Sequence, residues 1–314
     1  MRICYIVNTT CEDFHADMAY VSARFLRTVH PAAKIFCVTD TDSAAAMNQR
    51  KHPLLGVLDQ LITVEVPVET LKGKNRWLKM QLPEFLSGNF LYVDSDTLCI
   101  RKIDSLFHSA AVQSHSPFDI AVARDANVGR PGESRRKGDE EFWPSLKELG
   151  WRSPEAGYFN AGVIFFRDTE GTRNLCRRWA ELWEISSKSG HLYDQPAMNE
   201  AIRQCSPAMR VLAPTFNAMI LAKPRLVFTA KIVHLFASVA SVLECTPFFT
   251  LVRDVRRTGT LTDAAIARVL ADPFSWTSRA TFMQDCWSKN PLGAARLVLE
   301  RFVRTGDLRF RKAV

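Results

Sequence analysis

Two aspartates that follow a short apolar run are the residues with the clearest potential for chemistry. Phe90–Val93 is a run of aromatic and branched residues, which predicts a buried strand. Asp94 and Asp96 come directly after it, and residues i and i+2 of an extended backbone point the same way, roughly 6–7 Å apart. At the carboxyl edge of an α/β sheet such a pair can hold a divalent cation that also binds phosphates. The alternative is a simple turn, because aspartate and serine favour turns.

Strand and helix patterns alternate through the first two thirds of the chain. The segments expected to form strands are residues 2–7, 34–39, 61–66, 90–93, 119–123 and 231–234. Those expected to form helices are residues 14–29, 76–85 and 172–187. This alternation predicts an α/β fold with a mostly parallel, doubly wound sheet that helices cover on both faces.

The composition is that of a globular chain. Of its 314 residues 47% are hydrophobic, and no segment approaches the roughly 20 apolar residues of a membrane helix. The amino terminus has the pattern of a first core strand and not of a signal peptide. The eight cysteines are scattered without a C-x-x-C pair, which favours free thiols in a reducing cytoplasm. The net charge of +8 points to an anionic partner, either phosphates, a membrane surface or nucleic acid.

One long segment is expected to be a loop. Residues 126–141 contain three glycines, one proline and many charged residues. Loops of this length in a compact domain are often lids. We therefore predict that this segment becomes ordered over a bound ligand.

Six segments together resemble a known family. They are Trp77–Leu86, Phe90–Thr97, Ile103–Phe107, Tyr158–Val163, Asp194–Asn199 and Ile232–His234. In this order and spacing they resemble the nucleotide-sugar glycosyltransferases of the GT-A fold, most closely family 8, the glycogenin and bacterial lipopolysaccharide galactosyltransferase type. The resemblance covers roughly residues 2–236. It implies transfer of a hexose from a nucleoside-diphosphate sugar, expected to be a UDP-sugar, to a hydroxyl of a carbohydrate, lipid-linked or protein acceptor, with retention of configuration.

The resemblance assigns a metal site to Asp94, Asp96 and His234. A nitrogen ligand makes Mn²⁺ more natural than Mg²⁺ as the cofactor. Without the resemblance, a histidine in an apolar run would be interpreted as a core residue.

The resemblance also assigns catalytic positions. Asp194 and Gln195 precede Pro196 and are expected in the first turn of a helix, facing the donor sugar and the reacting carbon. Asp194 could equally be only a helix N-cap. Asp125, which ends a strand, matches a position that binds donor or acceptor sugar.

The remaining positions that the resemblance assigns bind the donor. Asn8, Thr9 and Thr10 follow the first strand, where the family has its uridine site. The small residues of an Asn-Ala-Gly segment would let the backbone approach the sugar, and the Asn amide would bind a hydroxyl. The alternative for this segment is an ordinary turn. Lys79 matches a basic residue that contacts the nucleotide in the family, and the alternative is a lysine on the exposed face of a helix. The full set expected to bind the donor is Asn8, Thr9, Thr10, Lys79, Asp94, Ser95, Asn160, Ala161 and Gly162.

The chain departs from the family pattern after the histidine. The family has a Gly and a Lys that grips the diphosphate, whereas residues 235–240 are Leu-Phe-Ala-Ser-Val-Ala. Lys223 and Arg225 are candidates for the diphosphate contact. The rival hypothesis is a protein of the same fold that binds nucleotide sugars, or assists assembly, without catalysis.

We expect residues 1–240 to form the catalytic domain and residues 241–314 a helical, basic extension. Within residues 291–314 six basic residues face two acidic ones. This segment either lies as an amphipathic helix on an anionic membrane surface or packs on the catalytic domain. No nucleic-acid-binding motif is recognised, so nucleic acid is not an expected partner. The expected location is the cytoplasm, at the inner membrane surface if the tail binds lipid. The apolar residues of its stripe are Leu292, Ala295, Leu299, Phe302 and Val303.

Overall fold

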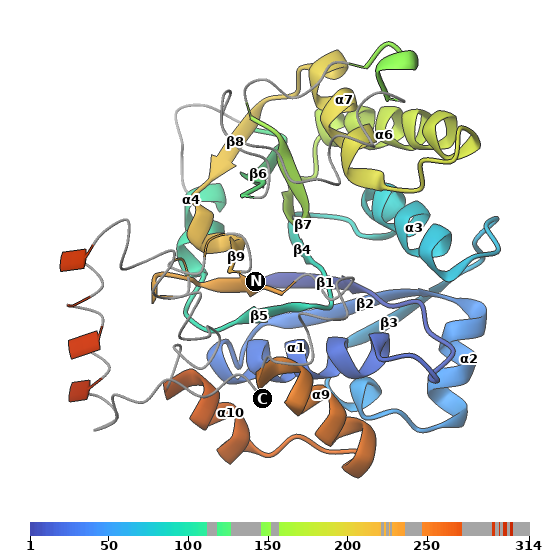
Figure 1. The fold of residues 1–314 in the computed structure, drawn as a ribbon. Helices are drawn as coiled ribbons and strands as arrows, with labels where there is room; N and C mark the ends of the chain where they lie inside the picture. Colours follow the sequence, from blue (N-terminus) through green and yellow to red (C-terminus); the bar gives the residue numbers. More distant parts are fainter. Residues whose placement is uncertain are drawn as a thin grey trace.

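The computed structural model has a central sheet between two groups of helices (Figure 1). The residues that it describes are 1–111, 118–126, 146–151, 157–220, 223, 226, 228–235, 247–271, 291, 292, 295, 298, 299, 302 and 303.

The main sheet has seven strands, and most of its pairs are parallel. Its members are β1 (Arg2–Ile6), β2 (Lys34–Asp40), β3 (Gln60–Val64), β4 (Phe90–Val93), β6 (Ile120–Arg124), β7 (Phe159–Phe166) and β8 (Met209–Leu212), in the order β3-β2-β1-β4-β7-β6-β8. Only β7 runs antiparallel to its neighbours, β4 and β6. The predicted mostly parallel α/β sheet is confirmed. The reversal at β7 was not predicted, because a hydrophobic run does not encode the direction of its partner.

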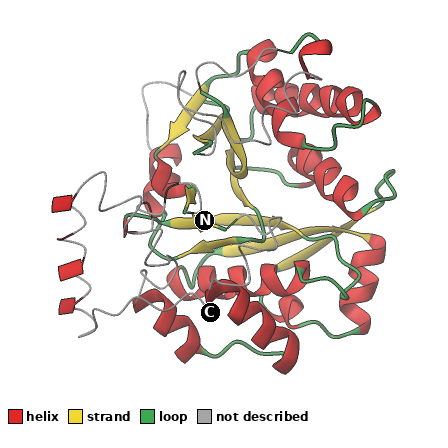
Figure 2. Ribbon diagram, viewed as in Figure 1, coloured by secondary structure: helices red, strands yellow, loops and turns green. Residues whose placement is uncertain are grey.

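Helices cover both faces of the sheet, as predicted (Figure 2). The α-helices whose bounds lie within the described residues are α1 (His15–Val29), α2 (Thr41–Gln49), α3 (Leu71–Phe85), α4 (Asp104–Ala111), α6 (Glu170–Lys188), α7 (Asp194–Cys205), α9 (Pro247–Thr258) and α10 (Asp263–Ala271). Helices α1, α9 and α10 pack on one face, and α3, α6 and α7 pack on the other. Strand β1 serves both layers: Ile3 and Tyr5 join the first core, and Cys4 and Ile6 join the second.

The predicted elements are present, with shifts at their ends. The helix expected from residue 76 begins five residues earlier, because the Thr70 hydroxyl caps it by accepting the Gly73 N–H at 3.1 Å. The helix expected over 172–187 begins at Glu170 after a similar cap from Thr169.

A small second sheet positions the late histidine. It consists of β5 (Thr97–Cys99), β10 (Ile232–His234) and β9 (Ala218–Met219). Strand β10 is antiparallel to β5, with His234 opposite Thr97. Because β5 follows the aspartate pair directly, this pairing brings two segments together that are far apart in sequence.

Three predictions concern segments that are largely outside the described residues. Of the predicted lid, residues 126–141, only the first residue is described, and the tail is described at isolated positions. There Leu292, Leu299, Phe302 and Val303 are exposed. The domain boundary at residue 240 stays a prediction. None of the described helices combines the length and the apolar character that crossing a membrane requires.

Trp179 tests how the second layer holds α7. Its side chain is 1% exposed, and its indole N–H donates to the Asp194 carbonyl at 2.8 Å. Trp179→Phe should keep most of the buried ring and lose this donor. We expect the free energy of unfolding in urea to fall by about 1–2 kcal/mol. Trp77→Phe, at a half-buried ring, is the control; equal losses in both variants would contradict the role given to the hydrogen bond.

Candidate functional site

The turn after β4 carries the two carboxylates. Thr97 donates to the Asp94 carbonyl through its backbone N–H, at 3.1 Å, and through its hydroxyl, at 2.7 Å. The Asp94 N–H donates to the Gly162 carbonyl at 2.8 Å. Asp94 and Asp96 therefore lie in a turn, and the prediction of extended backbone between them was wrong. The turn is compatible with the cation hypothesis, because both carboxylates approach the same histidine.

His234 meets these carboxylates from β10. Its Nε2 lies 3.4 Å from Asp96 Oδ1 and 3.9 Å from Asp94 Oδ2. One ligand atom from each of the three side chains lies within 4.8 Å of the others. Two carboxylate oxygens and one imidazole nitrogen form a donor set that suits a divalent transition-metal ion such as Mn²⁺.

Asn217 fixes the orientation of the His234 ring. Its amide nitrogen donates to Asn160 Oδ1 at 2.9 Å, so its oxygen is the atom that lies 2.9 Å from His234 Nδ1. That oxygen accepts the Nδ1–H of the imidazole. The other ring nitrogen, Nε2, then faces Asp94 and Asp96, where a proton or a cation must lie between nitrogen and carboxylate.

The pKa of His234 is raised above its ordinary value. Burial opposes the charged form, but the Asp96 carboxylate and, behind it, Asp94 and Asp125 outweigh burial. In the metal-free protein a proton therefore favours Nε2. A metal ion would have to displace that proton, because imidazole binds metals in its neutral form.

Gly162 leaves room for these ligands. A Cβ at this position would overlap His234 Cε1 and lie 2.7 Å from Asp94 Oδ2. The backbone N–H of Gly162 also donates to Asn160 Oδ1 at 2.9 Å. The close approach of His234 and Asp94 therefore requires the absence of a side chain at this position, whereas the sequence suggested the close approach of a sugar as the reason.

Lys79 joins the turn to the start of α7. Its Nζ lies 3.2 Å from Asp94 Oδ1 and 3.1 Å from Asp194 Oδ2, and its side chain is 6% exposed. The alternative of an exposed lysine was therefore wrong. Burial opposes the charge of Lys79, but Asp194 and Asp94 outweigh it, so the pKa of the ammonium is raised.

Asp194 is an ionised carboxylate. Burial favours its neutral form, but Lys79 and Arg76 outweigh burial and lower its pKa. Arg76 Nε lies 3.7 Å from Asp194 Oδ1. Tyr193 is the residue at the N-cap of α7, so the interpretation of Asp194 as only an N-cap was wrong.

A hydrogen-bonded group of Asp125, Asn160 and Gln195 lies beside the ligand set. Gln195 donates to Asp125 Oδ2 at 2.8 Å, and its oxygen accepts from Asn160 Nδ2 at 3.0 Å and from the Ala161 N–H at 3.1 Å. Asn160 is also 3.3 Å from Asp125 Oδ2. Because Asn160 Oδ1 accepts from Asn217, this group is continuous with the partner of His234.

Asn8, Thr9 and Thr10 belong to a second group at the same sheet edge, since β1 and β4 are parallel neighbours. Asn8 donates to Asp40 Oδ2 at 2.6 Å, and Lys74 Nζ lies 2.9 Å from Asp40 Oδ1. Burial favours the neutral carboxyl of Asp40, but Lys74 and hydrogen bonds from Ser43 and Asn8 lower its pKa to about 2. The Asn8 Oδ1 atom is buried and has no hydrogen-bond partner among the described residues, so its capacity to accept a hydrogen bond is unused there.

The structure thus brings most of the predicted site residues together. Ser95 lies half-buried in the turn between the two aspartates, and Lys223 is half-buried in a segment where Arg225 is not described. Sequence reasoning missed several partners, and nothing in their spacing distinguishes them from ordinary core or helix residues. Tyr92, for example, donates through its hydroxyl to Asp94 Oδ1. The residues joined by contacts around the turn are Lys79, Asp94, Asp96, Asp125, Asn160, Ala161, Gly162, Asp194, Gln195 and His234. The missed partners are Arg76, Tyr92 and Asn217 in this group and Asp40 and Lys74 in the second.

Gly162→Ala tests the ligand set without removing a ligand. The added methyl group should push His234 away from Asp94, so we expect the Mn²⁺ affinity measured by calorimetry to fall more than about tenfold. Gly56→Ala is the matched control, because a Cβ there would meet nothing within 4 Å. Equal Mn²⁺ affinity in the Gly162 variant and the wild type would argue against this site.

Comparisons with known proteins agree with this architecture. Residues 85–239 match the family model of nucleotide-diphospho-sugar transferases. No curated protein matches the chain. The structure of the galactosyltransferase LgtC with donor and acceptor sugar analogues superimposes with a TM-score of 0.53 at 15% identity, over 84% of this chain and 98% of LgtC.

A second solved structure has the same fold. The apo form of the glycosyltransferase GlyE from Streptococcus pneumoniae TIGR4 superimposes with a TM-score of 0.50 at 15% identity, over 86% of this chain and 63% of GlyE. At such identities the likeness concerns the fold alone. The chain has the GT-A type of nucleotide-diphospho-sugar transferase fold, and the resemblance to nucleotide-sugar transferases that its motifs indicated is confirmed over residues 85–239.

Proposed function

We propose that this protein is a metal-dependent glycosyltransferase that moves a hexose from a UDP-sugar to a hydroxyl acceptor with retention of anomeric configuration. The observation that carries the proposal is the convergence of Asp94, Asp96 and His234 at one edge of the sheet. All three lie within the region that matches nucleotide-diphospho-sugar transferases. The acceptor class, whether carbohydrate, lipid-linked or protein, follows only from the resemblance.

The nucleotide has a natural place beside β1 in this proposal. The buried Asn8 oxygen offers an acceptor to an N–H of the base, such as the imide of uracil. Its amide nitrogen is already held by Asp40, so the orientation of the acceptor is fixed before binding. The diphosphate would then extend along the sheet edge toward the turn after β4, since β1 and β4 are adjacent and parallel.

The sugar would face the start of α7. Asn160 and Gln195 present amides that can bind hydroxyls, and Asp125 orients Gln195. Asp194 is held as a carboxylate by Lys79 and Arg76, so it can stabilise positive charge at the reacting carbon but does not supply a proton. A divalent ion bound by Asp94, Asp96 and His234 would offset the charge that develops on the leaving diphosphate.

A nucleotide-sugar-binding protein without catalysis is the second candidate. It is favoured by one observation, the absence of Gly and Lys from residues 235–240. Incubation of excess enzyme with Mn²⁺ and a panel of UDP-sugars separates the two candidates, because an active transferase is expected to hydrolyse its donor slowly. Binding of a UDP-sugar without turnover, with or without acceptor sugars, would favour the second candidate.

Removal of one carboxylate tests the metal site. Asp96→Ala should lower the Mn²⁺-dependent affinity for UDP by more than about 100-fold in calorimetry, because a direct ligand is lost. Asp263→Ala is the control, since Asp263 is an exposed residue of α10 that pairs with Arg24. Retained metal-dependent affinity in the Asp96 variant, with wild-type circular dichroism, would refute the assignment.

The pH dependence of metal binding tests His234. Because its pKa is raised, the protonated and therefore non-binding form persists to a higher pH than in an ordinary histidine. Mn²⁺ affinity should therefore rise with pH across the range from about 5 to 9, and the rise should extend above the usual histidine pKa of about 6.5. His234→Gln should bind Mn²⁺ more weakly and with a flatter pH profile. An equally steep profile in this variant would assign the titration to another group.

A further inference from the structure

Asp13 stabilises the loop that carries the proposed nucleotide contacts, through hydrogen bonds within the loop. Residues 8–14 form most of the connection between β1 and α1. Asp13 accepts from the Thr9 hydroxyl at 2.7 Å and from the Thr10 N–H at 2.9 Å. Cys11 has a φ of +61°, a left-handed conformation that costs energy for a residue with a side chain. Such a loop needs outside contacts to hold one conformation.

Arg256 of α9 supplies some of those contacts from the other end of the chain. Arg50 supplies others, since its Nη1 donates to the Cys11 carbonyl at 2.9 Å and its Nη2 pairs with the Glu12 carboxylate. The Nη1 of Arg256 donates to the Glu12 carbonyl at 3.1 Å, and its Nη2 donates to the Asp13 carbonyl. Its Nε donates to Asp17 Oδ2, in the first turn of α1, at 2.8 Å. One planar guanidinium thus ties the two carbonyls at the end of the loop to the helix that follows.

Asp17 holds the guanidinium in place. The Asp17 side chain is buried, and its second oxygen lies 3.2 Å from His52 Nε2. His52 Nδ1 accepts the Leu54 N–H, so Nε2 is the ring nitrogen that donates to Asp17. With both oxygens occupied, the carboxylate has one orientation, and Arg256 has one docking geometry.

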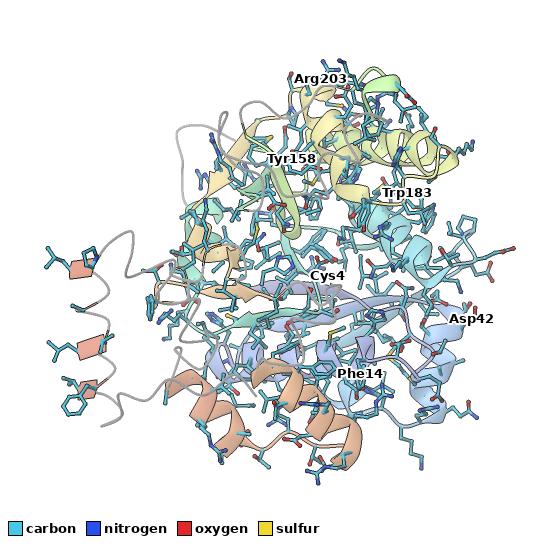
Figure 3. The ribbon with its side chains drawn as sticks, in the orientation of Figure 1. Cys4, Phe14, Asp42, Tyr158, Trp183 and Arg203 are labelled. Carbon is cyan, nitrogen blue, oxygen red and sulfur yellow. The ribbon has the colours of Figure 1, made fainter. Side chains whose placement is uncertain are left out.

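Packing fixes α9 against the same loop. The Arg256 guanidinium lies 4.6 Å from the centre of the Phe14 ring, and Phe14 makes an edge contact with Phe249 at 5.2 Å. Figure 3 labels Phe14 in this region, next to α9. Val252 and Val255 of α9 are fully buried in the core shared with α1. The helix therefore presents Arg256 to the loop from a rigid base.

We propose that Arg256 is a positioning residue for nucleotide binding, which holds residues 8–14 in the conformation that presents Asn8, Thr9 and Thr10 to the base and ribose. This inference rests on the proposed function for its ligand. Arg256 does not itself contact the nucleotide. Because Arg256 orders the loop when the protein folds, the loop loses less conformational entropy when the nucleotide binds, and the affinity for the nucleotide is higher.

Three variants and one charge control separate this role from simple stabilisation. Arg256→Gln removes the charge and the fork of donors. Arg256→Lys keeps a cation for Asp17 but cannot reach both carbonyls. Val252→Ala leaves Arg256 intact and destabilises the docking of α9 by opening a cavity. Arg257→Gln, on the same helix but paired only with Asp254 among the described contacts, controls for charge.

The measurements are amide hydrogen exchange of residues 8–14 without ligand, UDP affinity with Mn²⁺, and Mn²⁺ affinity alone, all well below the melting temperature. Both Arg256 variants should show faster exchange in the loop and UDP affinity about tenfold weaker, with Mn²⁺ affinity unchanged. Val252→Ala should lower the melting temperature with loop exchange and UDP affinity close to wild type.

Three results would overturn the inference. If the Arg256 variants bind UDP as the wild type does, Arg256 is only structural, and the proposed function stands. If the Val252 variant weakens UDP binding as much as the Arg256 variants, α9 docking in general and not this guanidinium holds the loop. A wild type that binds no UDP would refute the proposed function and the nucleotide role of Arg256 together, whereas the exchange data would still report whether Arg256 orders the loop.

Discussion

The site depends on the antiparallel pairing of β10 with β5. This pairing sets His234 opposite Thr97 and lets the Leu235 N–H donate to the Asp96 carbonyl at 3.0 Å. A shift of one residue would turn the imidazole to the opposite face of the sheet, away from both carboxylates. Asn217, just before β9, then selects the ring nitrogen that faces the turn. Two very short strands therefore bring together a candidate ligand set, in which His234 is more than 130 residues from the two aspartates and no local sequence pattern connects them.

The balance of charges around the turn favours a cation beside His234. Around the turn the carboxylates of Asp94, Asp96, Asp125 and Asp194 stand against the cations of Lys79 and Arg76. Both cations form ion pairs with Asp194, and of the two Lys79 alone also pairs with Asp94. The surplus of negative charge falls where His234 Nε2 points, which is why the pKa of that imidazole is raised. A divalent ion between these groups would relieve the same surplus more completely than a single proton, and would leave the site able to accept an anionic diphosphate.

The strands and helices were predicted from the periodicity of hydrophobic residues, and the candidate site residues from motifs. The features that were missed have physical reasons for leaving no sequence signal. The apolar runs at Phe90–Val93 and residues 34–39 correctly predicted strands β4 and β2, because buried strands are built from such side chains. The reversed strand β7 and the short strands β5 and β9 were missed, because direction and two- or three-residue pairings leave no periodic trace. The motif resemblance identified residues that meet in space. It did not reveal Asn217, whose importance lies only in the atom that it offers to His234.

The folding unit that serves the site extends beyond the region matched by the family model. That region ends at residue 239, yet Arg256 bonds to carbonyls at residues 12 and 13 and to a buried carboxylate in α1. Loss of α9 would leave one oxygen of the buried Asp17 side chain without its Arg256 partner, which is costly in a core. It would also expose the apolar face of α1 that Phe248 and Val252 cover. Helix α9, which follows His234 in the chain, therefore helps to hold the conformation of the N-terminal part. Its contacts with that part include the loop after β1.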